Sequence, residues 1–359
     1  MKGFCILFSL LMVLTGSISA GNLDNIKIKG DLRYRHEMID EEGADANHRH
    51  RIRARLFIGG KVNDEWNAGV QMATGSNDPV STNQTLDNAF SSKSVVLDLA
   101  YFEYKPEQVS GFTVFGGKFK NQFYKPGGSE LLWDSDFNPE GGAATFERQL
   151  DDLKIRAIGA GLWIDQRSDD DDSWLASGQL LGSYKVSDNM SLTLGGSYFN
   201  YVNTKGFRPF YDPDDPFGNS VDADTLYIND YELLELYLEG KMTVGEIPVT
   251  VMGDYVTNTA ADSLETGWLV GVHVGTQKNP GSWTLRYIYR EVEKDAVLGT
   301  FSDSDFRGGG TDAKGHELGG KLQVATNASF DVSYFINKIG LDQAESDFNR
   351  LQVDLQLKF

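Results

Sequence analysis

The sequence predicts an all-β protein, a transmembrane antiparallel β-barrel of about sixteen strands with short periplasmic turns and long extracellular loops. Three observations indicate this fold class. Apolar and polar residues alternate in segment after segment, short and long connections follow each other regularly along the chain, and the last alternating segment ends on an aromatic residue. After the first twenty residues, no segment approaches the roughly 20 consecutive apolar residues of a helical membrane span.

The alternation is clearest in the last nine residues, LQVDLQLKF. Leu351, Val353, Leu355, Leu357 and Phe359 share one face of a strand, and polar residues share the other face. The same period of two recurs in IKIKGDLRYR from residue 26 and in RIRARLFIGGK from residue 51. One such strand is weak evidence, but many in succession are strong evidence. A strand of a soluble sandwich also has an apolar and a polar face, so this pattern alone leaves a soluble exported β-sandwich binding protein open.

The connections favour a barrel over a sandwich. Short turns are expected at 62–65, 106–111, 149–152, 186–189, 244–247, 278–281 and 326–329. Long polar stretches lie between them, at 39–49, 76–94, 121–142, 165–174, 203–231, 258–266, 291–314 and 339–347. A sandwich has no reason to sort its connections by length, whereas an outer-membrane barrel places short turns in the periplasm and long loops outside. An even number of strands returns both termini to the periplasmic side.

The N-terminus predicts export. MKGFCILFSLLMVLTGSISA carries one Lys, an apolar run from Phe4 to Leu14 and small residues before position 21, which is typical of a cleaved signal peptide at residues 1–20. Residues 21–359 are then a single barrel domain. The only Cys of the chain, Cys5, lies in the signal, so a disulfide or a thiolate metal site is not expected. The formal net charge of −19 becomes −20 when Lys2 is removed, and so acidic a chain disfavours nucleic acid as a partner.

One long stretch resembles a known family. From Gly116 the chain runs GGKFKNQFYKPGGSELLWDSDFNPEGGAATF. This resembles the putative porin family of Gram-negative outer membranes, which includes general porins similar to phosphate-selective ones. In that family a G-K/R-x-K-N-x-F strand end leads into a loop with D-x-D-x-N-P-E-G, matched here by Asp134, Asp136, Asn138 and Glu140. Gln122 departs from the pattern, because Pro is expected at that position.

The resemblance implies a function and a set of partners. The function is passive diffusion of small hydrophilic solutes or ions through a water-filled channel in the bacterial outer membrane, with residues 121–142 as the constriction loop. Outer-membrane lipid and lipopolysaccharide are implied partners, and a homotrimer is a further expectation. The terminal Phe359 resembles the address that is read by the bacterial barrel-assembly machinery.

Basic residues on the inferred inner face suggest a weak anion preference. Arg33 and Arg35 on one strand and the row Arg51, Arg53 and Arg55 on the next would form a cationic wall, because adjacent strands lie about 5 Å apart. The other inward basic residues are expected to be Lys118, Arg156, Arg286 and Arg290. Arginine rows are a known way to pass anions. A solvated polar face without selectivity is an equally good interpretation, because acidic residues also face inward.

The predicted constriction loop carries acids that would oppose this wall. They are Glu130, Asp134, Asp136 and Glu140. Facing the arginines across the narrowest point, they would create a transverse field that sorts solutes by charge and dipole. The alternative is an external loop with solvated acids, since long barrel loops are usually external.

No motif supports catalysis, a cofactor or a specific metal site. His48 and His50 lack partners at metal-ligand spacing, and His316 in HELGG is not followed by the second His of a zinc helix. No GxSxG nucleophile elbow occurs. The prediction is therefore a protein that is not an enzyme. An outer-membrane barrel hydrolase stays an alternative, because a site assembled across strands carries no local motif. Acidic loops such as 169–172 could bind divalent cations, but such clusters are more often only solvated.

Overall fold

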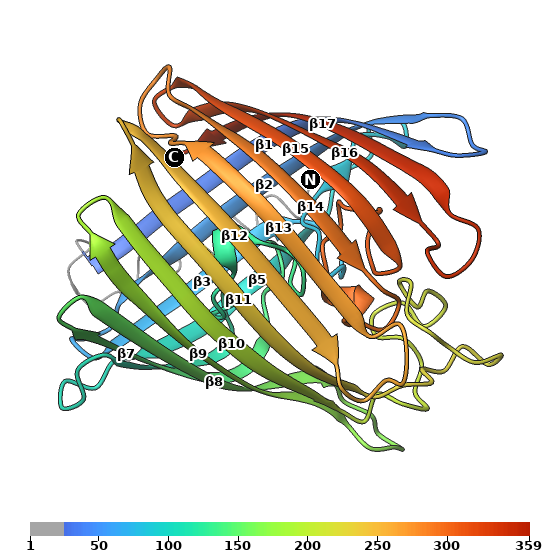
Figure 1. Cartoon of the computed structure of the whole chain (residues 1–359), viewed down its shortest axis with the longest axis horizontal. Coiled ribbons are helices and arrows are strands. Elements are labelled where there is room, and N and C mark those ends of the chain that lie inside the picture. The colour runs from blue at the N-terminus through green and yellow to red at the C-terminus, as the bar shows by residue number, and fades with distance from the viewer. Residues whose placement is uncertain (1–24) are drawn as a thin grey trace, which may run out of the picture.

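A closed antiparallel barrel makes up the whole described structure (Figure 1). The computed structural model describes residues 25–359, so the predicted signal at 1–20 lies outside the described residues. Its 17 strands form one sheet, which closes because β1 (Ile26–Glu41) pairs with β17 (Ser346–Lys358). One strand, β4 (Gln84–Thr85), has two residues and pairs with β2 (Asn47–Lys61). The remaining 16 strands form the wall, which confirms the predicted barrel and excludes the soluble sandwich.

The other strands follow in chain order around the wall (Figure 1). They are β3 (Trp66–Thr74), β5 (Val95–Tyr104), β6 (Phe112–Lys118), β7 (Glu140–Leu150), β8 (Leu153–Asp165), β9 (Ser173–Ser187), β10 (Met190–Val202), β11 (Tyr231–Val244), β12 (Ile247–Asn258), β13 (Thr266–Gly275), β14 (Trp283–Val292), β15 (Ala313–Ala325) and β16 (Ala328–Ile339). Residues 25–359 contain no helix that is long and apolar enough to cross a membrane.

The register sends apolar side chains outward and polar side chains inward. On β17, Leu355 is 44% exposed while Asp354 is buried, so the exposed side of the wall is the apolar one. This is the reverse of a water-soluble domain and suits a wall that faces lipid outside and a polar lumen inside. Phe359 is exposed beside β1, and its backbone exchanges two hydrogen bonds with Gly30, at 2.8 and 3.0 Å.

The predicted turns and loops alternate as expected, but the predicted loop 39–49 is wrong at both of its boundaries. The stretch 39–49 was expected to be a long loop, but β1 continues to Glu41 and β2 begins at Asn47. Its polar residues belong to strands because they pair across the sheet: Arg49 on β2 forms an ion pair with Glu37 on β1. Charge alone therefore did not distinguish a loop from a strand with a polar inner face.

Three long connections turn back into the barrel and fill part of it. A buried apolar cluster joins Phe123 and Trp133 from residues 119–139, Tyr227 from 203–230 and Phe301 from 293–312 to the inner faces of the strands. The sequence predicted inward folding for the first of these connections only. The apolar run 296–301 explains the third, because Ala296, Val297 and Leu298 are each at most 1% exposed.

Candidate channel constriction

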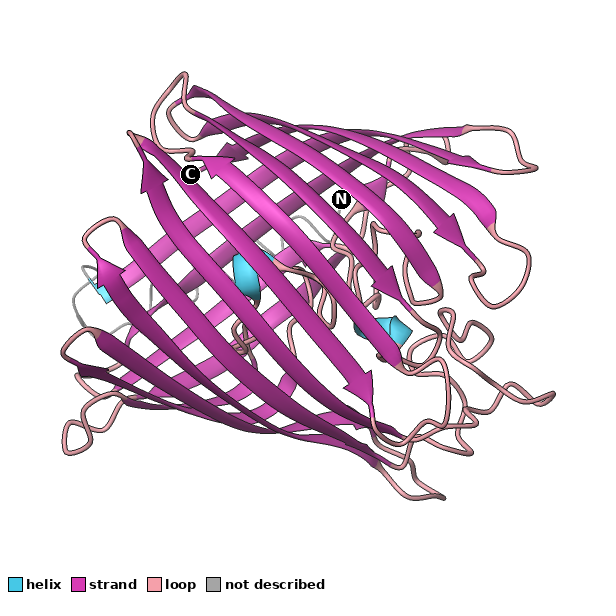
Figure 2. Ribbon diagram, viewed as in Figure 1, coloured by secondary structure: helices cyan, strands magenta, loops and turns pink. Residues whose placement is uncertain are grey.

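The segment 119–139, between β6 and β7, lies inside the barrel, where its short helix is drawn in cyan behind the front strands (Figure 2), and it is anchored to the inner wall by hydrogen bonds. The Tyr124 backbone N–H donates to Gln179 on β9 at 2.7 Å. The Gly127 N–H donates to Glu239 on β11 at 2.6 Å, and the Ser129 hydroxyl donates to Asp254 on β12 at 2.8 Å. Three strands therefore hold one short piece of the loop in place.

The anchored piece contains a single 3₁₀ turn, η2 (Pro126–Gly128). Gly127 has φ 58°, a left-handed conformation that glycine adopts without steric cost. A Cβ at this position would lie 2.5 Å from the sulfur of Met252 on β12. The left-handed backbone conformation favours glycine here, and a larger residue would also displace the Met252 side chain.

The connection 293–312 meets the loop 119–139 inside the barrel. The Asp134 N–H donates to the Phe301 carbonyl, and the Ser304 N–H donates to the Asp134 carboxylate, both at 2.9 Å. The ring of Phe137 lies 5.0 Å from that of Trp133 and 5.1 Å from that of Phe301, measured between centroids. Aromatic pairs at this separation add to the stability gained from burial. The two segments therefore act as one plug on this side of the lumen.

The space that remains between the plug and the opposite wall is polar. A cavity of about 390 Å³ lies there. Its basic lining residues are Arg33, Arg35, Arg53, Arg55, Lys120, Arg286, Arg290 and Lys321. Its acidic lining residues are Glu130, Asp136, Asp303, Asp305, Glu317, Asp331 and Asp354. Eight cations against seven anions leave a formal excess of +1 when all are ionised.

Arg33 and Arg35 of β1 and Arg53 and Arg55 of β2 line this cavity, and they do so as ion pairs. Arg53 and Arg55 lie 3.0 and 2.7 Å from Asp31, and 3.6 and 3.3 Å from Asp136. Arg35 donates twice to Asp354, both times at 2.8 Å. The carboxylates offset much of the arginine charge, so the open cationic wall expected from the sequence is instead a row of paired charges.

Arg51 differs from its neighbours, because it does not line the cavity. Its guanidinium lies 3.8 Å from Glu37, which is fully buried. Glu37 also forms ion pairs with Arg49 and Arg350, and it accepts a hydrogen bond from Gln352 at 3.1 Å. Sequence reasoning missed Glu37 and Arg350, although both stand at inward positions of strands whose alternation was recognised.

The other predicted basic residues each have a partner. Lys118 donates to Glu140 at 2.9 Å, and Arg156 donates to the Gln122 carbonyl at 3.0 Å. Arg286 pairs with Glu317, and Arg290 lies 2.9 Å from Asp303. Glu140 thus begins β7 beside Lys118 and does not face the arginines of β1 and β2.

Only one of the four predicted loop acids faces those arginines. Burial alone would raise the pKa of Asp136, but Arg53, Arg55 and Arg33 outweigh it and hold the pKa below its ordinary value. Asp136 is therefore ionised at neutral pH. Of the four acids expected to create a transverse field against the arginines, only Asp136 lies opposite them, in direct contact with Arg53 and Arg55.

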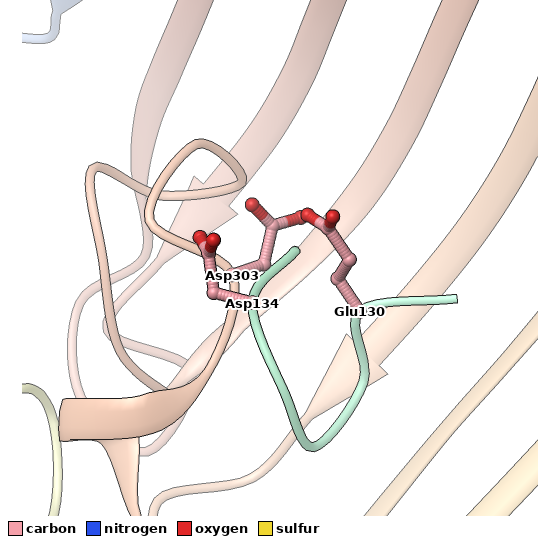
Figure 3. Close-up of side chains that lie close together, drawn as sticks. All are labelled: Glu130, Asp134 and Asp303. Atoms are coloured by element: carbon pink, nitrogen blue, oxygen red, sulfur yellow. The ribbon is translucent and has the colours of Figure 1, made fainter. Parts of the chain in front are cut away.

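Glu130 and Asp134 form a separate cluster with Asp303 (Figure 3). Their carboxylate oxygens lie within 4.8 Å of one another. Burial, and next the negative charge of Asp303, raise the pKa of Glu130 to about 8, and burial with Glu130 raises the pKa of Asp134 well above its ordinary value. The spacing would suit a divalent cation. However, Arg290 already neutralises Asp303, and burial favours the protonated forms, so the arrangement does not require a metal.

Lys120 is a lining cation that sequence reasoning did not select. Its side chain forms no ion pair within residues 25–359. Burial, and next repulsion by Arg55, lower its pKa. The spacing of two between Lys118 and Lys120 was a sign in the sequence that both side chains face inward. Lys120 lies just beyond the end of β6, where the strand alternation no longer applies.

Fold and lumen together define the class of protein: a β-barrel of the bacterial outer membrane with a charged, partly plugged interior. A model of the family described as "Putative porin" matches residues 39–225 and 230–359, so the chain belongs to the putative porin family. Its place is therefore the bacterial outer membrane. A search of curated proteins found no match.

Solved porin-like barrels share the fold at low sequence identity. The chain is similar to OprB of Pseudomonas putida, with a TM-score of 0.60, 10% identity, and coverage of 96% of this chain and 97% of that one. It is also similar to OmpF of Salmonella typhi in complex with daunomycin, with a TM-score of 0.58 and 13% identity over 93% of this chain and 98% of that one. It is similar as well to the trimer form of OmpT, an outer-membrane protein of Vibrio cholerae, with a TM-score of 0.51 and 14% identity over 94% of this chain and 100% of that one.

Proposed function

We propose that this protein is a passive channel for small hydrophilic solutes or ions, with a weak anion preference and without enzymatic activity. The observation that carries the proposal is the polar cavity between the anchored loop 119–139 and the strands β1, β2 and β17. Sixteen-strand barrels leave an aqueous lumen, because their interior is too wide for wall side chains to fill. Here three long connections narrow that lumen and charged groups line the remaining space.

The sign of the preference follows from the balance of charge in the cavity. When every charged lining residue is ionised, the net charge of the cavity is +1. At neutral pH Glu130 is protonated, because its pKa is about 8, and the net charge is then +2. The acidic external loops oppose it, but exposed charges are screened over about 8 Å at physiological ionic strength. The charges of a narrow cavity with low-dielectric walls are screened less and act on the permeant directly. Since most of the arginines are paired, the preference for anions is weak.

The test is the zero-current potential of the pore in a salt gradient. Arg53→Ser combined with Arg55→Ser lowers the lining from eight cations to six, so its net charge at neutral pH, with Glu130 protonated, falls from +2 to 0 and the potential should shift toward cation preference. The matched control replaces Asp169, Asp170, Asp171 and Asp172 in the exposed loop between β8 and β9 by Ser and should hardly change the potential at high salt. The opposite ranking would place selectivity in the loops. Folded, pure protein that gives no conducting steps in a planar bilayer would reject the channel itself.

The proposal includes partners that follow from the surface and the family. The apolar outer face would contact lipid, and the acidic loops would contact the divalent cations and phosphates of lipopolysaccharide. The exposed ring of Phe359, at the end of the closing strand, is available to the barrel-assembly machinery. A homotrimer is proposed by analogy with the trimer form of OmpT, and chemical cross-linking in outer-membrane vesicles would test it.

A further inference from the structure

The barrel wall is interrupted where β6 and β7 stop short. The last residue pair between β5 and β6 at this end is Ala100 with Lys118. The last pair between β6 and β7 is Lys118 with Glu140. Residues 95–99 of β5 therefore pair with β3 alone among the strands of residues 25–359. On the other side of the interruption, Trp163 of β8 pairs with Trp174 of β9.

A cavity of about 770 Å³ lies at this interruption. Leu97 and Trp163 line it from the lipid side, where they are 52% and 71% exposed. Asp98 and Asn138 line it from the lumen side, where both are buried. A cavity that both sets of side chains touch is an opening between the two faces, and we call it the wall opening.

A second, aromatic cavity of about 150 Å³ continues from the wall opening. The two share five lining residues, among them Asn138 and Trp163. The rings of Trp133, Phe137 and Phe301 line the aromatic cavity. An apolar cavity of about this volume accommodates one benzene ring.

Two buried polar atoms in the lining lack partners within the described part of the chain. Asn138 Nδ2 donates to the Asp98 carboxylate at 2.7 Å. A carboxylate only accepts, so this bond fixes the orientation of the amide and leaves Asn138 Oδ1 as an acceptor without a donor. The indole nitrogen of Trp133 is likewise unpartnered, although Trp133 is only 2% exposed. Buried polar groups without partners are rare and point to an absent water or ligand.

The charge of the wall opening is negative. Asp78 accepts a hydrogen bond from the Val80 N–H at 2.9 Å, and Asp98 accepts from the amides of Gln71 and Asn138. Neither carboxylate forms an ion pair within residues 25–359. The one cation of the lining, Lys118, is already bound to Glu140 and to the Asn138 carbonyl. The open acceptors, Asn138 Oδ1 and the two unpaired carboxylates, thus favour a cationic donor over an anion, whereas the Trp133 indole N–H is an open donor.

We propose that the wall opening and the aromatic cavity form a binding site for small cationic amphiphiles, molecules with one ring and one ammonium group. The ring occupies the aromatic cavity against the rings of Trp133, Phe137 and Phe301 that line it. The ammonium donates to Asn138 Oδ1 and faces Asp78 and Asp98. Because the opening reaches the lipid side, such a molecule enters without passing the charged constriction, a route that passive diffusion of hydrophilic solutes does not use.

The experiment measures binding of phenethylammonium to the folded protein in detergent micelles by saturation-transfer NMR, with empty micelles as background. Phenylacetate carries the same ring with the opposite charge, and butylammonium carries the charge without the ring. We expect phenethylammonium to bind about tenfold more tightly than either, because only it matches both parts of the site. Equal binding of phenethylammonium and phenylacetate would overturn the proposal.

Three variants locate the site. Ile164→Phe fills the aromatic cavity and should abolish binding. Asp78→Asn should weaken it about fivefold, the size of a partly exposed charge pair. The matched control Asp224→Asn, in an exposed loop, should bind as the unmodified protein does. Unchanged single-channel conductance in each variant shows that the barrel is folded.

Two results would refute the site. Equal binding by the Asp78→Asn and Asp224→Asn variants would remove the role of the carboxylate. Binding that is absent in an oligomer and appears only on its dissociation would show that a second copy of the chain covers the opening.

Discussion

The two sides of the lumen are stabilised by different interactions. Along β9, β11 and β12, the wall is covered by the loop 119–139, which is held by hydrogen bonds and by an aromatic cluster around Trp133. Along β1, β2 and β17, the wall carries ion pairs such as Arg35 with Asp354, and the polar cavity lies beside them. One side therefore supplies rigidity and the other supplies charge. A passage that lies beside only one of them is off-centre, so the strands that fix selectivity are not those that hold the constriction loop.

The largest effect is expected on the charged side, from Glu37→Ala. Glu37 is fully buried among Arg49, Arg51 and Arg350, and its removal leaves Arg49 and Arg51 without their carboxylate partner and Arg350 with Asp305 alone. Loss of one member of such a network costs about 3 to 5 kcal/mol. Denaturant unfolding in detergent measures it. The control Glu107→Ala, in an exposed periplasmic turn, should change the free energy of unfolding little. A loss for Glu37→Ala as small as that of the control would mean that the network does not stabilise the barrel.

A smaller effect is expected on the loop side, from Tyr124→Phe. The Tyr124 hydroxyl donates to the Glu239 carboxylate, and a hydrogen bond to a charged group contributes about 1.5 to 3 kcal/mol. Its loss should loosen the loop 119–139 and increase the noise of the open-channel current. Hydrogen exchange of the 119–139 amides is the direct measurement. If exchange accelerates over the whole barrel and not in this segment, the loop is not a separately anchored unit.

The smallest effect is a dependence of selectivity on pH. The pKa of Glu130 is raised to about 8, so this carboxyl is neutral below pH 8 and charged above it. The cavity then gains one negative charge between about pH 6.5 and 9.5, and the zero-current potential should move toward cation preference with a midpoint near pH 8. Glu130→Gln should remove that midpoint. A variant that keeps it would assign the titration to another group.

Sequence patterns predicted the wall well because each strand faces two solvents. Because lipid contacts the outside and water the inside, apolar and polar residues must alternate along each strand, and a few residues such as LQVDLQLKF already show this alternation. The charge of the inner wall was predicted in kind but not in pairing. Asp31 and Asp354 stand on the same inner face as the arginines, yet which carboxylate reaches which guanidinium depends on strand register. For Asp31 this is the register of the consecutive strands β1 and β2, and for Asp354 it is that of β1 and β17, from opposite ends of the chain.

The loop contents were predicted less completely, for a different reason. Residues inside the lumen belong to no repeating element, so periodicity carries no information about them. The run AVLGTF at 296–301 lies inside a polar stretch, and its apolar composition was the available sign that this segment is buried. Asp134 was selected for its charge, but in the structure it joins two loops through backbone N–H groups, including that of Ser304.

The pairing of β1 with β17 has a consequence for how the protein is made. Asp354 contacts Arg35 across 319 positions of sequence, so the seam cannot form until the last residues have been synthesised and exported. Until then, both seam strands present unpaired backbone edges, which invite pairing with other chains. Contacts of such long range also slow folding, because a large loop must close before any stabilisation is gained. A chain that lacks its final strand would keep two open edges for its whole lifetime, which makes it a target for proteolysis and aggregation.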